Sequence, residues 1–156
     1  MNQLQTGKAP LVVAGEQTAS GSMGLQNSSP KTKILIVEDD TPLAMMMVHV
    51  LSRAGCDVEV ANTGKKGLEL AQQSKFDLIT LDIDLSDGNG FSLCLELKQR
   101  HLSRKTPVVF VSGRQSEQDI QRGIEAGAVD YITKPFGVEF APRLLSHVGQ
   151  ERKISS

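Results

Sequence analysis

Residues 33–40, KILIVEDD, set the pattern from which the fold can be predicted. The apolar run Lys33–Val37 is followed at once by three acids and then by Pro42, a residue that suits the first turn of a helix. A short, continuously apolar run of this kind is typical of a strand that is buried on both faces of a sheet. The motif therefore predicts a strand that ends in carboxylates and passes directly into a helix.

This strand-helix unit is expected five times along the chain. We expect strands at 33–37, 57–61, 76–81, 107–111 and 129–133, and helices from Pro42 up to Gly55, at 65–73, at 91–100, at 116–126 and within 138–148. In the first helix one apolar stripe is predicted from Leu43, Met46, Met47, Val50 and Leu51. Central strands that are apolar throughout indicate a parallel sheet with helices on both faces. Because crossover connections are right-handed, the predicted fold class is α/β with a doubly wound five-stranded parallel sheet.

Length, composition and charge narrow the class of protein. The 156 residues include 39% hydrophobic and 22% charged residues, which fits one globular domain. Seventeen basic and eighteen acidic residues give a formal charge of −1, which argues against broad capture of nucleic acid or of an anionic membrane. No apolar run has the roughly 18 to 20 residues that a membrane helix needs. Cys56 and Cys94 lie far apart, so neither a disulfide framework nor a zinc site is predicted, and a reducing cytoplasm is the expected location.

Three segments are distinguished by composition. Residues 1–30 carry only Lys8 and Glu16 as charges and are rich in Gly, Ser, Gln, Asn and Thr, so they are expected to be a disordered leader or linker. Residues 31–150 contain all the strand and helix patterns and form the predicted domain. Residues 151–156 are expected to be a tail.

Polar side chains gather where the predicted strands end. Ligands of doubly wound sheets bind beyond the carboxyl ends of the strands, so these positions are the candidate site. The polar residues at or just after the ends of the first, third, fourth and fifth strands are Glu38, Asp39, Asp40, Asp82, Asp84, Asp87, Ser112 and Lys134. Carboxylates packed together need a cation, and oxygen ligands suit Mg²⁺ rather than zinc. An Asp beside Mg²⁺, with Lys and Ser nearby, is typical of a site that accepts a phosphoryl group.

Four motifs carry a resemblance to a known family. They are ILIVEDD at 34–40, LDIDLSDGNG at 81–90, PVVFVSG at 107–113 and DYITKPF at 130–136. In this order and at these spacings they resemble the receiver domain of bacterial two-component response regulators, over about 120 residues. The resemblance implies a flavodoxin-like strand order of 2-1-3-4-5. It also implies a cis peptide bond between Lys134 and Pro135.

The resemblance implies a role for each site residue. Asp82 is the expected phosphorylated aspartate. Asp39 is expected to bind Mg²⁺, or Mn²⁺ in its place, directly, while Glu38 acts through water and Asp84 contributes its backbone carbonyl. The remaining members of the site are a hydroxyl that binds the phosphoryl group, its ion-pair partner and an aromatic that turns inward on activation, namely Ser112, Lys134 and Tyr131.

The implied function is that of a signalling switch rather than a turnover enzyme. A histidine kinase or a phosphotransfer protein would pass its phosphoryl group to Asp82. The modified domain would then bind a downstream effector, or a second copy of itself, through the face formed by the fourth strand, fourth helix, fifth strand and fifth helix. No direct contact with nucleic acid or membrane is expected. The chain is expected to be either a single-domain regulator or the receiver module of a larger regulator or hybrid kinase.

One alternative belongs to another class of protein. Asp82 and Asp84 form a DxD at a strand end, similar to the haloacid-dehalogenase phosphatases, which use an Asp nucleophile. Those enzymes place a second acidic pair downstream and usually carry a cap insertion. Here the acidic pair, Glu38 and Asp39, lies upstream, and no cap insertion fits the length.

A further pair is predicted to tune how long the phosphoryl group persists. Asp84 lies two residues beyond the acceptor and Arg114 two residues beyond Ser112, so their side chains can meet across the same rim. A bidentate pair there would crowd the approach of the attacking water. The alternative is two independent solvated side chains.

Four remaining residues carry simple expectations. Pro142 fits the last helix only within its first turn. His49, His101 and His147 have no ligand spacing and are assigned no chemistry.

Overall fold

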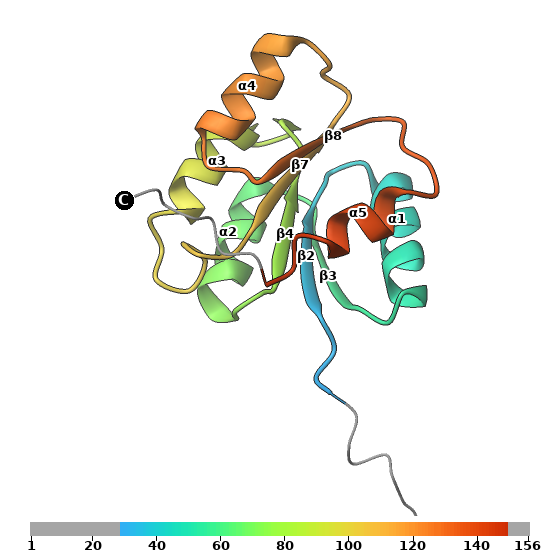
Figure 1. Ribbon diagram of the computed structural model, residues 1–156. Helices are drawn as coiled ribbons and strands as arrows, with labels where there is room; N and C mark the ends of the chain where they lie inside the picture. The colour runs from blue at the N-terminus through green and yellow to red at the C-terminus, as the bar shows by residue number, and fades with distance from the viewer. Residues whose placement is uncertain (1–28, 150–156) are drawn as a thin grey trace, which may run out of the picture. The chain divides into compact units, whose positions relative to one another are not determined.

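The computed structural model describes residues 29–149, so nearly all of the predicted leader and the whole predicted tail lie outside the described residues. Five parallel strands form the central sheet: β2 (Lys33–Val37), β3 (Asp57–Ala61), β4 (Leu78–Leu81), β7 (Val108–Ser112) and β8 (Asp130–Thr133). Their order across the sheet is β3-β2-β4-β7-β8 (Figure 1). Counted along the chain this is 2-1-3-4-5, so the predicted fold class and strand order are confirmed.

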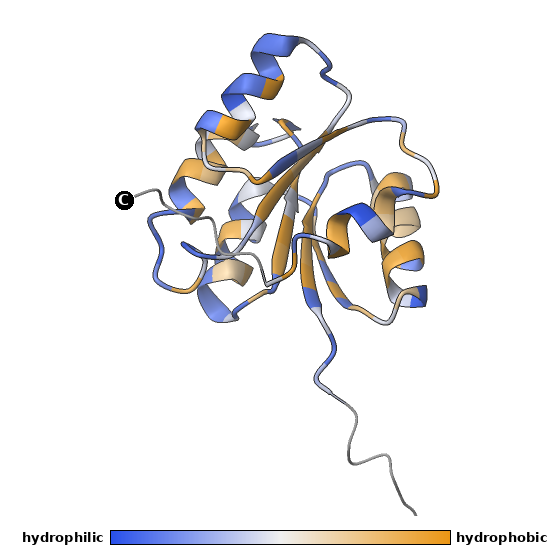
Figure 2. Cartoon of the chain, in the orientation of Figure 1, coloured by the Kyte–Doolittle hydropathy of each residue, from blue (hydrophilic) through white to orange (hydrophobic). Residues whose placement is uncertain are grey.

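Helices cover both faces of this sheet, as Figures 1 and 2 show. On one face α1 (Thr41–Arg53) and α5 (Phe140–Leu145) pack against alternate strand residues, among them Ile36 and Val109. On the other face lie α2 (Gly64–Gln73), α3 (Gly90–Leu97) and α4 (Glu117–Glu125), which pack against the intervening residues, among them Leu35 and Phe110. The central strands β2, β4 and β7 are therefore buried on both sides, which explains their largely apolar sequence, whereas the edge strand β3 is mostly exposed or half-buried.

Helix α1 begins as expected but faces the core differently. The Asp40 side chain accepts a hydrogen bond from the Leu43 amide at 3.1 Å and caps the helix, and Gly55 follows its end with φ of 92°. The predicted stripe is wrong at Met46, whose side chain is 44% exposed, whereas Ala44 is buried beside Met47. Apolar residues occupy nearly every position of this helix, so periodicity alone defines its inner face poorly.

Several element boundaries differ from the prediction. The third helix ends at Leu97 instead of residue 100, because the chain turns at Lys98 into the loop before β7. A two-stranded hairpin, β5 (Asp84–Leu85) with β6 (Gly88–Asn89), was not predicted.

Pro142 is the third residue of the six-residue α5 and so lies in its first turn, as expected. The peptide bond between Lys134 and Pro135 is cis, also as expected.

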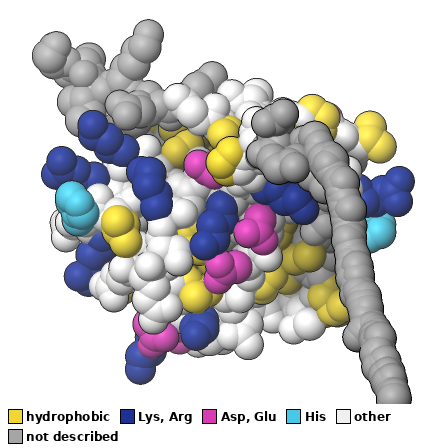
Figure 3. Space-filling model, turned by 90° about the horizontal axis from the view of Figure 1, so that it is seen from below, with side chains coloured by type: hydrophobic (Ala, Val, Ile, Leu, Met, Phe, Trp, Pro, Cys, Tyr) yellow, Lys and Arg dark blue, Asp and Glu magenta, His cyan; other side chains and the backbone are white. Residues whose placement is uncertain are grey.

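Charged side chains occur at both edges of the sheet. The carboxylates described below lie where the strands end. Seen from below, the edge at which the strands begin carries a group of Lys and Arg side chains on one side (Figure 3). A hollow of about 280 Å³ there is lined by Lys75, His101, Leu102, Arg104 and Lys105. Among the described residues, no helix combines the length and the apolar character that crossing a membrane requires.

An ion cluster that sequence reasoning missed holds α5 against the edge strand β8. The Asp130 carboxylate accepts hydrogen bonds from Arg143 Nε and Nη2, both at 2.8 Å, and its Oδ2 lies 2.9 Å from His147 Nε2. Arg143 Nη2 also donates to the Tyr131 carbonyl at 3.1 Å. Burial raises the pKa of Asp130, but the hydrogen bonds from Arg143, His147 and the Tyr131 amide outweigh it and lower the value to about 2. His147 therefore has a structural contact.

Asp130→Asn is expected to destabilise the fold at neutral pH and to have less effect in acid. The pKa of Asp130 is depressed from 3.8 to about 2 in the folded protein. The carboxylate therefore stabilises the fold fully above about pH 5, and this contribution is lost as the pH falls from about 5 to about 2. Partial exposure screens the contacts, so the expected loss at neutral pH is about 1–2 kcal/mol. Urea unfolding at several pH values measures it, with exposed Asp57→Asn as the matched control. A pH-independent difference between Asp130→Asn and wild type would contradict the assignment.

Candidate functional site

The site lies at the edge where the strands end, and two backbone contacts place its central acids there. The Glu38 amide donates to the Ala61 carbonyl at 3.0 Å, and the Asp82 amide donates to the Val37 carbonyl at 3.1 Å. These bonds continue the sheet ladders by one residue beyond β2 and β4. Glu38 and Asp82 are therefore fixed next to each other. Their exposed fractions are only 2% and 8%, respectively.

Three carboxylates meet at this edge. Glu38, Asp39 and Asp82 each place a carboxylate oxygen within 4.8 Å of the others. Lys134 Nζ approaches two of them, at 2.7 Å from Glu38 Oε1 and 3.1 Å from Asp82 Oδ2. Three negative charges around one ammonium leave the cluster short of positive charge, and an all-oxygen donor set fits Mg²⁺. The residues present therefore suit a hard divalent cation.

Burial and charge shift the pKa values of two of these groups. Burial raises the pKa of the Glu38 carboxyl above its ordinary value, because the charged form loses hydration, and the neighbouring Asp82 charge adds to this. Burial alone would lower the pKa of Lys134. The hydrogen bonds and charges of Glu38 and Asp82 outweigh it and raise that pKa, so the ammonium remains charged.

The loop after Asp82 folds back tightly against the acceptor. Asp82 Oδ1 accepts from the Ile83 amide at 2.7 Å and from the Asp84 amide at 3.4 Å. A Cβ atom added to Gly90 would lie only 2.2 Å from the Asp82 carbonyl oxygen, so no other residue fits at that position without a backbone shift. Gly90 lies in the quoted motif, but its steric role was not predicted.

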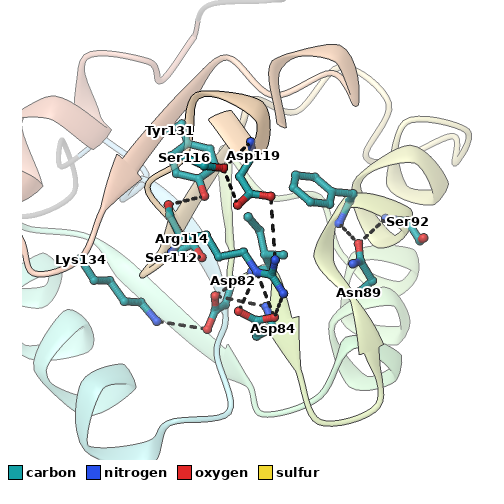
Figure 4. A network of polar contacts seen from close by, with 12 residues as sticks. Asp82, Asp84, Asn89, Ser92, Ser112, Arg114, Ser116, Asp119, Tyr131 and Lys134 are labelled. Carbon is teal, nitrogen blue, oxygen red and sulfur yellow. Dashed lines mark hydrogen bonds and ion pairs between the residues drawn. The ribbon is translucent and has the colours of Figure 1, made fainter. Parts of the chain in front are cut away.

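Ser112, Arg114 and Tyr131 form a linked group beside Asp82 (Figure 4). Ser112 ends β7, is fully buried, and accepts a hydrogen bond from the Arg114 amide through Oγ at 3.2 Å. The Tyr131 hydroxyl donates to the Arg114 carbonyl at 2.7 Å, and Tyr131 is only 6% exposed. Burial raises the pKa of Tyr131 above its usual range. The predicted hydroxyl and aromatic are thus brought together, and the Arg114 backbone connects them.

The predicted contact between Arg114 and Asp84 is present. Arg114 Nη2 donates to Asp84 Oδ1 at 2.7 Å, and Arg114 Nε donates to Asp84 Oδ2 at 3.0 Å, which is a bidentate pair. The Arg114 hydrogen bonds hold the pKa of Asp84 below its ordinary value. On its other side Arg114 Nη1 lies 3.9 Å from Asp119 in the first turn of α4, a contact that was not predicted. The guanidinium therefore connects the β5–β6 hairpin with α4.

Two acids at this edge point away from the cluster. Asp40 caps α1 through its contact with the Leu43 amide. Asp87 accepts hydrogen bonds from the Gly64 and Lys65 amides at 2.8 and 2.9 Å. The role of Asp87 was missed because its partners precede it by more than twenty residues.

Comparison with known proteins places these features in one family. The family described as the response regulator receiver domain matches residues 34–145. The response regulator ArlR of Staphylococcus saprophyticus is 39% identical over 108 residues, which are 69% of this chain and 48% of that protein. The alkaline phosphatase synthesis transcriptional regulatory protein PhoP of Bacillus subtilis is 38% identical over 104 residues, 67% of this chain and 42% of PhoP. The chain thus spans about half the length of the curated relatives it matches.

Solved structures show the same similarity in three dimensions. The chemotaxis response regulator CheY4 of Vibrio cholerae superposes with a TM-score of 0.71 at 29% identity, over 76% of this chain and 98% of CheY4. The receiver domain of HemR from Leptospira biflexa gives 0.68 at 33% identity, over 75% and 93% of the two chains. These similarities favour the receiver interpretation over the haloacid-dehalogenase alternative. The motifs, the sheet order and the matched relatives agree, and the chain belongs to the response regulator receiver domain family.

Proposed function

We propose that Asp82 accepts a phosphoryl group from the phosphohistidine of a histidine kinase or a phosphotransfer protein. One observation carries the proposal: the Asp82 carboxylate directly follows the central strand β4, 3.1 Å from Lys134 Nζ and with carboxylate oxygens of two further acids within 4.8 Å. An Asp82 oxygen attacks phosphorus while the P–N bond breaks, and the imidazole keeps the bonding electrons. The product is an acyl phosphate on Asp82.

We propose that Mg²⁺, or Mn²⁺ as a substitute, is bound for this step by the carboxylates of Glu38, Asp39 and Asp82 and by the backbone carbonyl of Asp84. When bound, the ion neutralises charge on the phosphoryl oxygens. Lys134 Nζ, held charged between Glu38 and Asp82, is placed to pair with one phosphoryl oxygen. The three carboxylate oxygens within 4.8 Å support this donor set.

The modified domain is proposed to act as a switch. The phosphoryl group adds negative charge and strong acceptors beside Ser112, whose hydroxyl can donate a hydrogen bond to it. Movement of Ser112 Oγ toward that group would alter the hydrogen bond that Oγ accepts from the Arg114 amide. A shift of Ser112 acts on the backbone of Arg114 and thereby on Tyr131, whose hydroxyl donates to the Arg114 carbonyl. The affected surface is the face of β7, α4, β8 and α5, where we expect an effector or a second copy of the chain to bind.

The same proposal covers the class of protein, its partners and its location in the cell. The domain changes state once per phosphorylation, so we propose a signalling switch and no turnover enzyme. Its partners are proteins rather than nucleic acid or membrane, because the formal net charge is −1. The domain serves either alone or as the receiver of a larger regulator or hybrid kinase. Cys56 and Cys94 are buried thiols, which fits a reducing cytoplasm.

Intact-mass measurement tests the proposed reaction. Incubation with a small acyl phosphate and Mg²⁺ is expected to add one phosphoryl group, and a chelator should prevent the addition. Addition of several groups, or equal addition with the chelator, would contradict a single Mg²⁺-dependent acceptor. The matching acceptor variant is treated in the Discussion.

Arg114→Ala is expected to shorten the life of the phosphorylated protein severalfold. Water must approach in line with the departing Asp82 oxygen, and we propose that the Arg114–Asp84 pair obstructs that approach. The pair is exposed, with 46% and 61% of its side chains accessible, so the melting temperature should change little. The contacts of the Arg114 backbone with Ser112 and Tyr131 survive the substitution. The measurement is the decay of phosphorylated protein after the donor is removed.

Asp84→Ala is the partner variant for this prediction, because it removes the other half of the pair and keeps the Asp84 carbonyl. Both variants should decay at similarly increased rates, and the double variant should decay no faster than either one. If both single variants decay at the wild-type rate, the pair does not restrict water.

A further inference from the structure

The Asp87 carboxylate joins two elements, α2 and the β5–β6 hairpin, that follow the strands on either side of β2. Asp87 sits in the turn of the β5–β6 hairpin and is exposed. Its Oδ1 accepts from the Gly64 amide at 2.8 Å, and its Oδ2 accepts from the Lys65 amide at 2.9 Å. These are the first two amides of α2, which lack partners within the helix. Both oxygens are therefore used by one helix end.

The hairpin side of this contact carries a proposed metal ligand. The Asp84 carbonyl belongs to β5, whose residue Asp84 pairs with Asn89 and whose residue Leu85 pairs with Gly88. Asp87 lies between these paired positions. A shift of the turn is consequently passed along the two-residue strand to Asp84.

The helix side of the contact is fixed to the acidic pair. The Glu38 amide donates to the carbonyl of Ala61, three residues before Gly64. Within α2, Gly67 approaches β2 so closely that a Cβ would lie 2.8 Å from Val37 Cγ2. The first turn of α2 therefore has a defined position relative to Glu38 and Asp39. The contact of Asp87 closes a ring that runs from these acids through β3 and α2 to the hairpin.

We propose that Asp87 is a positioning residue that sets the distance between the Asp84 carbonyl and the carboxylates of Glu38, Asp39 and Asp82, and thereby the affinity for Mg²⁺. This rests on the proposed metal site. The amide hydrogen bonds from Lys65 and Gly64 lower the pKa of Asp87, so the contact persists across the neutral range. Partners of this indirect kind typically change metal affinity about 10- to 100-fold when removed.

A purely structural role, as a cap of α2, makes a different prediction. Thr63 already supplies a side-chain cap, because its Oγ1 accepts from the Lys66 amide at 3.0 Å. If Asp87 served only the helix, its loss would lower the melting temperature and leave Mg²⁺ affinity of the folded protein unchanged. Metal affinity therefore separates the two roles.

The test is a calorimetric Mg²⁺ titration of the full chain, without phosphodonor, for wild type, Asp87→Ala and Asp87→Asn. We expect Asp87→Ala to weaken Mg²⁺ binding about tenfold and Asp87→Asn, which retains one acceptor, to fall between. Asp57→Ala, an exposed acid at the start of β3, is the matched control and should bind like wild type. Hydrogen exchange of the metal-free protein should be faster at residues 83–90 in Asp87→Ala.

Two comparisons decide the outcome. Loss of the Asp87 charge alone would also weaken Mg²⁺ binding, but that effect should vanish at about 1 M KCl, where the Debye length is about 3 Å. A tenfold loss that persists at high salt supports positioning; affinity within twofold of wild type, or a loss that salt abolishes, overturns it. If wild type itself neither binds Mg²⁺ nor accepts a phosphoryl group, the proposed function fails. If wild type does both and Asp87→Ala binds Mg²⁺ equally well, only the positioning role is wrong.

Discussion

Asp82→Asn is expected to reduce phosphoryl uptake to the detection limit. The amide has nearly the shape of the carboxylate, so its Oδ1 can still accept from the Ile83 amide and the loop after β4 should keep its position. The amide lacks the negatively charged oxygen that attacks phosphorus. The chemical step is thus removed while the geometry is retained. Intact mass after incubation with a small acyl phosphate and Mg²⁺ measures the result.

Asp84→Asn is the matched control for the acceptor variant. It removes a charge two residues away, and it keeps both Asp82 and the Asp84 backbone carbonyl. This variant should therefore still take up one phosphoryl group. Equal uptake by Asp82→Asn and wild type would show that another group is the acceptor, and loss of uptake in both variants would show that charge at this edge matters more than the identity of the nucleophile.

The parallel sheet was predictable because its central strands β2, β4 and β7 are buried on both faces, whereas the order of the strands was implied by the family resemblance. Such strands must be apolar at every position, and the runs Lys33–Val37 and Val108–Ser112 stand out in the sequence for that reason. Helix α1 was harder to orient, since Met45, Met46 and Met47 are all apolar and only packing decides which of them is buried. The hairpin β5–β6 was missed because two-residue strands leave no periodic pattern.

The site residues that lie at the ends of strands could be predicted from the sequence. Glu38, Asp82 and Lys134 end or follow parallel strands, so the topology alone brings them to one edge. The pairing of Asp84 with Arg114 was also predicted, because both loops start from neighbouring strands. The ring closed by Asp87 and the cluster around Asp130 were missed. Both depend on where a helix end lies in space, which periodicity does not determine.

Asp39→Ala is expected to abolish Mg²⁺-dependent phosphoryl uptake and to stabilise the metal-free protein. The Asp39 carboxylate lies within 4.8 Å of those of Glu38 and Asp82, and the single ammonium of Lys134 balances only part of this charge. Removing one carboxylate relieves repulsion that is present only when no cation is bound. We expect a rise in melting temperature of about 2–4 °C in chelator, with uptake at the background level.

Asp40→Ala gives the decisive contrast, because it removes the same charge one residue further along. Asp40 caps α1 through the Leu43 amide, and loss of such a cap costs about 1 kcal/mol. Its melting temperature should therefore fall, while Mg²⁺-dependent uptake should remain. Opposite shifts in the two variants would assign repulsion to the cluster and capping to its neighbour. If Asp39→Ala still takes up the phosphoryl group, and chelator has no effect, then Asp39 holds no ion and the charge of the cluster is balanced by Lys134 alone.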